Sequence, residues 1–189
     1  MDLKLITAVA TEPVTLTEVK SHLRLDGTAE DTYLSSLTTV AREYCETITR
    51  RALATQTLEL ILDDFPCDYI ELPKSPVQSI TSIKYKDSNG DETTWATYVS
   101  DLDKVPALIM PEYGDSFPSF IPYPSGAVRV RYVAGHKSDG VVLPTSIKQA
   151  MLLLIGHLYE NREETIAKKL ENIPLGIKSL LANYRIWGW

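Results

Sequence analysis

The fold is decided by the stretch TYLSSLTTVAREYCETITRRALATQTLELIL, residues 32–62, where the spacing of the apolar residues changes. Its first part predicts an amphipathic helix, because apolar residues recur there every three or four positions: Tyr33, Leu34, Leu37, Val40, Ala41, Tyr44, Cys45 and Ile48. From Leu58 onwards, leucines alternate with Glu59 and Ile61, and a period of two is typical of a strand. The chain is therefore expected to pass from helix to sheet near residues 51–54.

A short helix over residues 15–25 is predicted to precede this stretch. Thr15 can cap its first turn, and Glu18, three positions later, is the partner expected in a capping box. Val14 and Val19 occupy the two positions of a hydrophobic staple. These signals together predict where the first helix begins.

Two longer helices are predicted, over residues 28–52 and 145–163. In the first, Thr28 and Asp31 repeat the spacing of cap and carboxylate. The second is apolar on two flanks, formed by Ile147, Met151, Leu154 and Leu158 and by Leu152, Ile155 and Tyr159. We expect it to be buried on two sides, either within one core or between that core and a neighbouring subunit. Gly156 indicates close packing, because Gly costs a helix about 1 kcal/mol relative to Ala.

Residues 55–134 are predicted to form a small antiparallel sheet. Val128, Val130 and Tyr132 alternate with arginines, and Asn89-Gly90 is a strong hairpin signal between SIKYKD and TTWATYV. A loop rich in proline interrupts this region at residues 110–126, and it carries four aromatic residues: Tyr113, Phe117, Phe120 and Tyr123. Two interpretations stay open, since these aromatics could fold back over the sheet edge or bind a partner.

The charge of the chain argues against duplex DNA as a direct ligand. The formal net charge is −6, opposite in sign to a surface that neutralises phosphates. Residues 162–189 carry five Lys and Arg against three Glu, so this end is at +2 and the rest of the chain at −8. Such asymmetry suggests a C-terminal segment that binds something else.

Few residues offer catalytic chemistry. The three histidines lack a second ligand at metal-binding spacing, and the glycines form no phosphate-binding loop. Cys45 lies on an apolar helix stripe, and nothing near Cys67 in the sequence would activate its thiol. We therefore predict a non-enzymatic protein without metal or cofactor. A small cysteine hydrolase using Cys45 or Cys67 is the enzymatic alternative.

The fold class predicted from these patterns is α+β. Helices from both ends of the chain would form a bundle, with the small antiparallel sheet inserted between them. Residues 1–172 would make one domain, followed by a tail, residues 173–189, that is first extended and then a short amphipathic helix. Two cysteines fit a reducing cytosol, and we expect neither a signal peptide nor a membrane-spanning helix.

Three segments, taken in their order along the chain, together form a pattern that is typical of one protein family. They start at TLTEVKSHLRLDG (residues 15–27), at VRVRYVAGHKSDG (residues 128–140, continuing through LPTSIKQAMLLLIGHLYENRE) and at IPLGIKSLLANYRIW (residues 173–187). Together they resemble the head-tail connector (adaptor, head-completion) family of tailed phages and prophages, often labelled putative DNA-packaging proteins. The resemblance covers residues 14–66 and 126–187, and residues 67–125 show no motif of that family.

The resemblance implies a structural ring under the portal vertex of a virion, made in the host cytoplasm. Such a ring extends the DNA channel, through which DNA only passes, and it offers a surface to a stopper or tail-completion protein. The resemblance also implies a C-terminal segment that docks on the portal protein, here Ile173, Leu180, Leu181, Tyr184, Arg185, Ile186 and Trp187. A stopper or tail-completion protein of the same particle is the alternative within this class.

Subunit contacts within the ring are expected on two helices. The predicted interface residues are Leu152, Ile155, Gly156 and Tyr159 of helix 145–163 and Arg42 and Glu46 of helix 28–52. The proline-rich loop with Tyr113, Phe117, Phe120 and Tyr123 is a further candidate contact for a partner.

Overall fold

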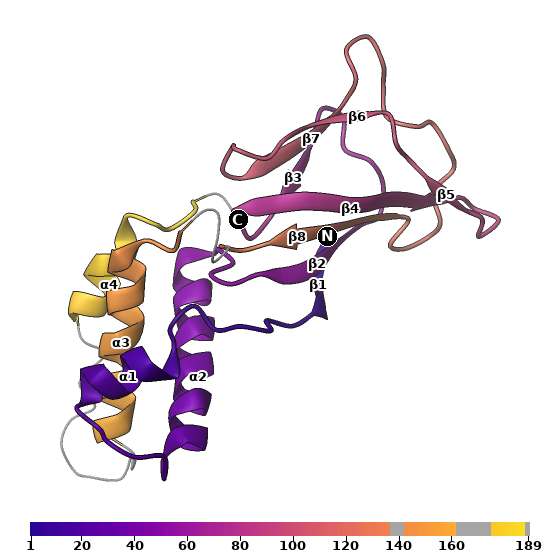
Figure 1. The fold of residues 1–189 in the computed structure, drawn as a ribbon. Helices are drawn as coiled ribbons and strands as arrows, with labels where there is room; N and C mark the ends of the chain where they lie inside the picture. The colour runs from indigo at the N-terminus through magenta and orange to yellow at the C-terminus, as the bar shows by residue number, and fades with distance from the viewer. Residues whose placement is uncertain (137–141, 162–174, 188–189) are drawn as a thin grey trace. The chain divides into compact units, whose positions relative to one another are not determined.

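The computed structural model describes residues 1–136, 142–161 and 175–187, and it confirms an α+β protein (Figure 1). The described residues form four helices and two antiparallel sheets. The chain divides into two compact units, each built from two separate stretches of sequence. We call Met1–Ala10 with Ala54–Gly135 the β unit, and Thr11–Leu53 with His136–Trp189 the helical unit.

A five-stranded antiparallel sheet is the larger part of the β unit. Its strands in spatial order are β1 (Asp2–Thr7), β2 (Gln56–Leu62), β8 (Val128–Ala134), β4 (Val77–Lys86) and β5 (Glu92–Thr94). The predicted alternation is confirmed on β8, where Val128, Val130 and Tyr132 are buried and the two intervening arginines are exposed. One face of this sheet is therefore apolar and the other polar.

A three-stranded sheet packs on the apolar face. It is formed by β3 (Ile70–Leu72), β7 (Ala107–Pro111) and β6 (Tyr98–Asp101), in that order. Tyr132 of the larger sheet donates its hydroxyl to the Pro73 carbonyl oxygen at 2.8 Å, and the Trp95 ring lies 5.5 Å from the Tyr98 ring. Ile70 and Ile109 are at most 2% exposed, so the two sheets enclose a common core.

The hairpin at Asn89-Gly90 is present, but its second arm is shorter than predicted. The Asp87 carboxylate accepts the amides of Asn89 and Asp91, and Gly90 takes a positive φ of 95°. β5 ends at Thr94, and the following residues enter the other sheet as β6. The single predicted sheet is thus two sheets, and β1, at the start of the chain, was not predicted at all.

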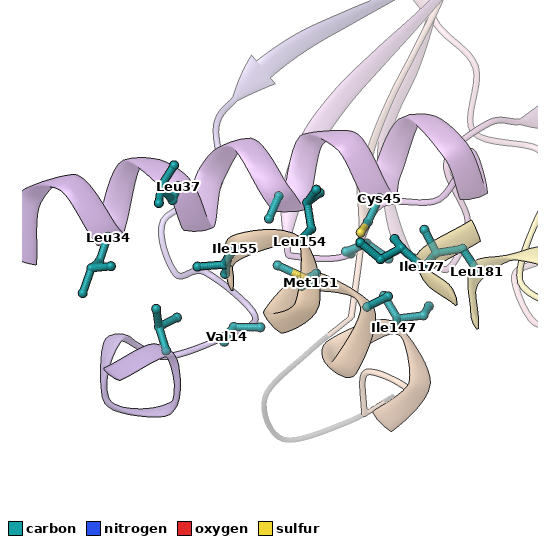
Figure 2. Packing of buried hydrophobic residues seen from close by; sticks show 14 residues of the cluster. Val14, Leu34, Leu37, Cys45, Ile147, Met151, Leu154, Ile155, Ile177 and Leu181 are labelled. Carbon is teal, nitrogen blue, oxygen red and sulfur yellow. The ribbon is translucent and has the colours of Figure 1, made fainter. Parts of the chain in front are cut away.

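The helical unit packs its helices around one apolar cluster (Figure 2). The helices are α1 (Leu16–Leu23), α2 (Asp31–Thr49), α3 (Thr145–Glu160) and α4 (Leu175–Ala182). Leu34, Met151 and Ile155 are at most 1% exposed, and each fully buried side chain of this kind contributes about 1.5–3 kcal/mol. This cluster holds the unit together.

The start of α1 is confirmed and the start of α2 is corrected. Thr15 accepts the Glu18 amide at 3.3 Å, Glu18 accepts the Thr15 amide at 2.9 Å, and both staple valines are buried. α2, however, begins at Asp31, and its N-cap is Glu30 rather than Thr28. α3 begins at Thr145 as predicted and ends at Glu160.

Part of the predicted tail lies outside the described residues. The boundary at residue 172, Ile173 and the last two residues are among these, so the division into a domain and a tail stays a prediction. α4 itself packs within the helical unit, through Ile177 and Leu181. Among the described helices, none is long and apolar enough to cross a membrane.

Candidate assembly surfaces

The C-terminal segment folds onto its own helical unit. Ile177 and Leu181 are fully buried beside Cys45 and Ile147 in the apolar cluster (Figure 2). After α4 the backbone is tied to the end of α2, because the Ile186 amide donates to the Thr49 carbonyl at 3.0 Å. Arg51 Nε donates to the Tyr184 carbonyl at 2.6 Å. The segment is therefore part of the fold of this unit.

This geometry divides the predicted docking residues into buried and exposed ones. Leu181 and Ile186 are 0% and 6% exposed, so in this conformation they pack inside the helical unit, and their docking on a portal stays a prediction. Leu180 and Tyr184 are half-buried, whereas Arg185 is exposed. Trp187 is 75% exposed, and the Arg185 guanidinium lies 4.5 Å from its ring centroid. Arg185 and Trp187 form the accessible part of the predicted docking surface.

The predicted interface on α3 also faces inwards. Ile155 is fully buried, and half-buried Leu152 packs against the unit's own cluster. A Cβ on Gly156 would lie 3.6 Å from His22 Nε2, so the close neighbour of Gly156 is α1 of the same chain. Tyr159 donates its hydroxyl to Glu30 of the same unit. Helix α3 is buried on two sides, as predicted, but other helices of the same chain cover both sides.

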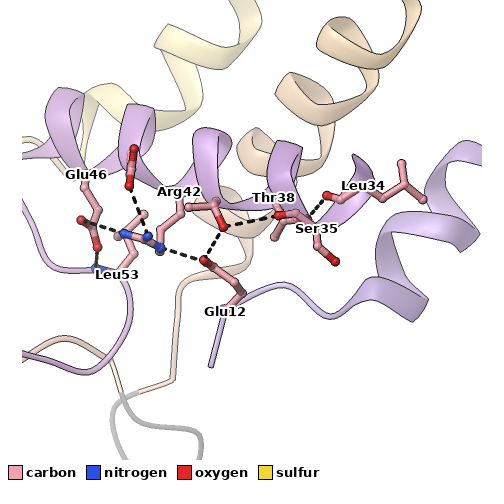
Figure 3. Close-up of polar contacts among 9 residues, drawn as sticks. Glu12, Leu34, Ser35, Thr38, Arg42, Glu46 and Leu53 are labelled. Carbon is pink, nitrogen blue, oxygen red and sulfur yellow. Dashed lines mark hydrogen bonds and ion pairs between the residues drawn. The ribbon is translucent and has the colours of Figure 1, made fainter. Parts of the chain in front are cut away.

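Arg42 and Glu46 form a buried ionic network (Figure 3). Arg42 donates to Glu12 Oε2 at 2.9 Å and lies 3.3 Å from Glu46 Oε2. The other carboxylate oxygen of Glu46 accepts the Leu53 amide at 2.9 Å. Both side chains are 9% exposed, so in this conformation they are paired within the chain, and their assignment to a subunit interface stays a prediction. They connect α2 to the residues that precede and follow it.

The four aromatic residues of the proline-rich loop fall into two groups, one folded back on the sheet and one exposed. Phe117 stacks on Phe65 at 5.1 Å, and Phe120 lies 4.9 Å from the Tyr85 ring, so these two fold back onto the sheet. Tyr113 is fully exposed, and Tyr123 is 39% exposed with the Lys86 amino group 4.2 Å from its ring centroid. The two tyrosines are therefore the exposed aromatic residues of this loop, and a partner contact there stays a prediction.

The structure gives no support to cysteine chemistry at Cys45. Its side chain is fully buried, and burial raises the pKa of the thiol to about 12. A thiol that stays protonated at neutral pH is a poor nucleophile. Cys67 is exposed on the other unit. Within the described ranges no three His, Cys, Asp or Glu side chains cluster as metal ligands.

A charged face of the five-stranded sheet was missed by the sequence analysis. Glu59 lies in a shallow hollow with Arg131 at 2.7 Å and Arg129 at 4.0 Å, and Lys84 binds Glu92 beside it at 2.6 Å. The alternation in VRVRY showed that the arginines point away from the core. Glu59 and Lys84 lie next to these arginines because of the strand register. Register joins distant segments, so it cannot be predicted from the pattern of any single segment.

Solved structures similar to this chain are components of gene transfer agent particles. It matches a chain of the virion of a native gene transfer agent particle at 28% identity and a TM-score of 0.80. Chains from the neck of an empty particle computed with C6 symmetry (29%, 0.78) and of a native particle computed with C12 symmetry (28%, 0.76) also match. Each match covers 98% of this chain and 95% of the other.

A comparison with protein families matches the first half of the chain. Residues 13–102 match the family described as Phage gp6-like head-tail connector protein, which confirms the resemblance inferred from the sequence. The match starts where the first predicted segment starts and extends into residues that had shown no motif, while the C-terminal segments lie beyond it. No curated protein sequence matches the chain.

Proposed function

We propose that this chain is a structural head-tail connector that assembles as a ring at the portal vertex of a phage-like particle. The observation that carries the proposal is the match to neck chains over 98% of the sequence, together with the connector family match. A ring of 12 copies would satisfy both symmetries named for those necks, C6 and C12. Such a ring would extend the DNA channel between the portal and the tail.

The charge of the β unit suits a protein beside a DNA channel. The β unit carries 13 acidic and 7 basic side chains, a net charge of −6, while the helical unit is neutral. Carboxylates near the lumen would repel phosphates and let DNA slide past. DNA would accordingly be passing content rather than a ligand.

Docking on the portal would use the exposed end of the C-terminal segment. Arg185 and Trp187 are of the residue types that most often dominate the binding energy of interfaces, and both are accessible. A ring presents this pair once per subunit, so weak individual contacts would add by multivalency. The exposed Tyr113 would be available to a stopper or tail-completion protein.

Native mass spectrometry of the full chain, alone and with the portal protein of the same particle, tests the proposal. Truncation before α4 would remove Ile177 and Leu181 from the core, so point variants are the better probe. Arg185→Ser with Trp187→Ser should abolish portal binding and leave the helical CD spectrum unchanged. The matched control, Arg24→Ser with Val40→Ser, removes one cation and one exposed apolar side chain elsewhere in the helical unit and should bind normally.

Two results would contradict the proposal. If the native chain stays monomeric with and without the portal, the connector function fails and a stopper or tail-completion role becomes the better explanation. If the Arg185 and Trp187 variant binds the portal like the native chain, the ring stands but the docking segment is wrong.

A further inference from the structure

The basic residues of the β unit are concentrated on one face. Five of its seven Lys and Arg side chains lie on the polar face of the five-stranded sheet, which we call the basic sheet face: Lys4, Lys84, Lys86, Arg129 and Arg131. Three carboxylates share this face, from Asp2, Glu59 and Glu92. The face is therefore at +2, whereas the rest of the β unit is at −8.

Strand register explains why these charges are adjacent. Glu59 pairs with Lys4 on β1 and with Arg131 on β8, and Arg129 pairs with Lys84 on β4. Residues that face each other across antiparallel strands have their Cβ atoms about 4.5–5.5 Å apart. Three strands thus place their cations in one continuous surface.

The cations on this face keep accessible donors. Glu59 is almost fully buried beneath the two arginines, yet the Arg129 and Arg131 side chains are 53% and 44% exposed. A guanidinium has five N–H donors, and the closest approach of Arg129 to Glu59 is 4.0 Å. Glu59 therefore fixes the base of the arginines, while their outer donors can bind a further carboxylate.

The outer face of the other sheet has the opposite character. Glu71 on β3 and Asp101 on β6 pair with Leu108 of β7 from its two sides, and Asp103 follows in the next loop. We call this surface the acidic face; the neighbouring Lys104 lies in the same loop, so the three carboxylates and this cation sum to −2. Val99 and Val105, which are 49% and 46% exposed, lie on β6 and in the loop that leads to β7. This surface therefore combines negative charge with two aliphatic side chains that a partner could cover.

We propose that the basic sheet face of one copy binds the acidic face of the next copy around the ring. This inference rests on the ring proposed above and identifies its subunit contact. Cyclic assembly needs two different complementary surfaces on every chain, because each copy meets its neighbours head to tail. The basic sheet face and the acidic face of the β unit have opposite charge, as two complementary surfaces require. The charges set the register of the contact, and the aliphatic side chains add buried apolar area.

Charge reversal on each face, followed by both together, tests the inference. The basic-face variant is Lys84→Glu with Arg129→Glu, which leaves Arg131 to pair with Glu59. The acidic-face variant is Asp101→Lys with Asp103→Lys. Assembly is measured by native mass spectrometry, with and without the portal protein, after near-UV CD has shown that each variant is folded. Each variant alone should assemble at least about tenfold more weakly than the native chain, since like charges would then meet.

Two further variants keep the test decisive. The four substitutions together exchange the signs of both faces and should restore ring formation. The control, Arg24→Glu with Lys178→Glu, makes the same change of net charge on exposed residues of the helical unit and should assemble normally. If the basic-face variant unfolds, Lys84→Gln with Arg129→Gln removes both cations without adding a charge beside Glu59 and Glu92, and it should still weaken the ring.

The outcomes separate the inference from the proposed function. Rings that form as well in both reversed variants as in the native chain overturn the inference and leave the connector function intact. A native chain that assembles neither alone nor on the portal overturns both. If the native chain binds duplex DNA and the basic-face variant loses only that binding, the face contacts DNA instead of a second copy.

Discussion

Arg42 lies among three carboxylates, so its replacement by Met removes the cation that Glu12 and Glu46 share. The expected loss of stability is about 3 kcal/mol, because a buried ion pair that loses one partner leaves an uncompensated charge. Urea unfolding followed by CD at 222 nm measures it. Arg42→Met with Glu46→Gln should recover part of the loss, since a glutamine can still accept the Leu53 amide. An unchanged midpoint in the single variant would contradict the network's structural role.

Glu18 predicts a dependence of stability on pH. The hydrogen bond from Lys148 and the bond from the Thr15 amide hold the pKa of the Glu18 carboxyl below its usual value. The ionised carboxylate therefore stabilises the folded chain above the unfolded-state pKa, and this stabilisation is lost as pH falls through the folded-state pKa. Glu18→Gln should unfold at lower urea concentration than the native chain at pH 7. The two midpoints should converge as pH falls through the folded-state pKa of Glu18.

The sequence predicted the capping partner of Glu18 but not the intrachain partners of Arg42, and the physical reason is the same for both. A capping box is a contact between residues three positions apart, so the sequence contains the whole interaction. Arg42 lies on the polar flank of α2, and the groups that bury it come from residue 12 and residue 53. A helical pattern predicts which residues share a face, but it does not predict what segment covers that face.

At the scale of elements, we expect small and large side chains in place of Gly156 on α3 to change the stability of the helical unit in opposite directions. A Cβ there would meet His22 and Leu23 of α1 at 3.6–3.9 Å, which is ordinary van der Waals contact. Gly156→Ala should therefore stabilise the helical unit by up to about 1 kcal/mol, through helix propensity. Gly156→Leu should destabilise it by about 1–3 kcal/mol, because the extra atoms would displace α1. Thermal unfolding by CD measures both, and equal effects of Ala and Leu would contradict the packing.

The strands that sequence predicted are the ones with an alternating burial pattern. On β8 the buried residues recur at every second position, and on β2 the buried leucines at 58 and 60 do so, with Glu59 buried between them on the polar face. β1 is an edge strand with five of its six residues exposed, and β3 and β6 have three and four residues. Short or exposed strands need few apolar residues, because backbone hydrogen bonds to the neighbouring strand hold them in the sheet. Such strands are therefore hard to predict from the pattern of apolar residues.

At the scale of the whole molecule, sequence periodicity located the helices and much of the sheet, whereas several side chains predicted to lie on assembly surfaces are buried within the chain. Ile155, Leu181 and Ile186 have the apolar character of interface residues, and the structure uses that character within the chain. The remaining candidates are exposed charged and aromatic groups, such as Arg129, Arg185 and Trp187. Their grouping depends on register and on backbone contacts between distant segments.

The response of the ring to salt follows from the proposed contact between charged faces. Raising the ionic strength from about 0.1 M to about 1 M shortens the Debye length from about 10 Å to about 3 Å, which weakens attraction between partly exposed charges. Rings of about 253 kDa, twelve chains of 21.1 kDa, should therefore dissociate towards smaller species in sodium chloride. Sedimentation velocity at several salt concentrations measures this, with CD at 222 nm confirming that the helices persist.

The variant with all four charges exchanged should dissociate over the same range of salt, because its attraction is also electrostatic. Rings that become more stable in high salt would show that apolar contacts dominate the interface and that the charges serve another purpose.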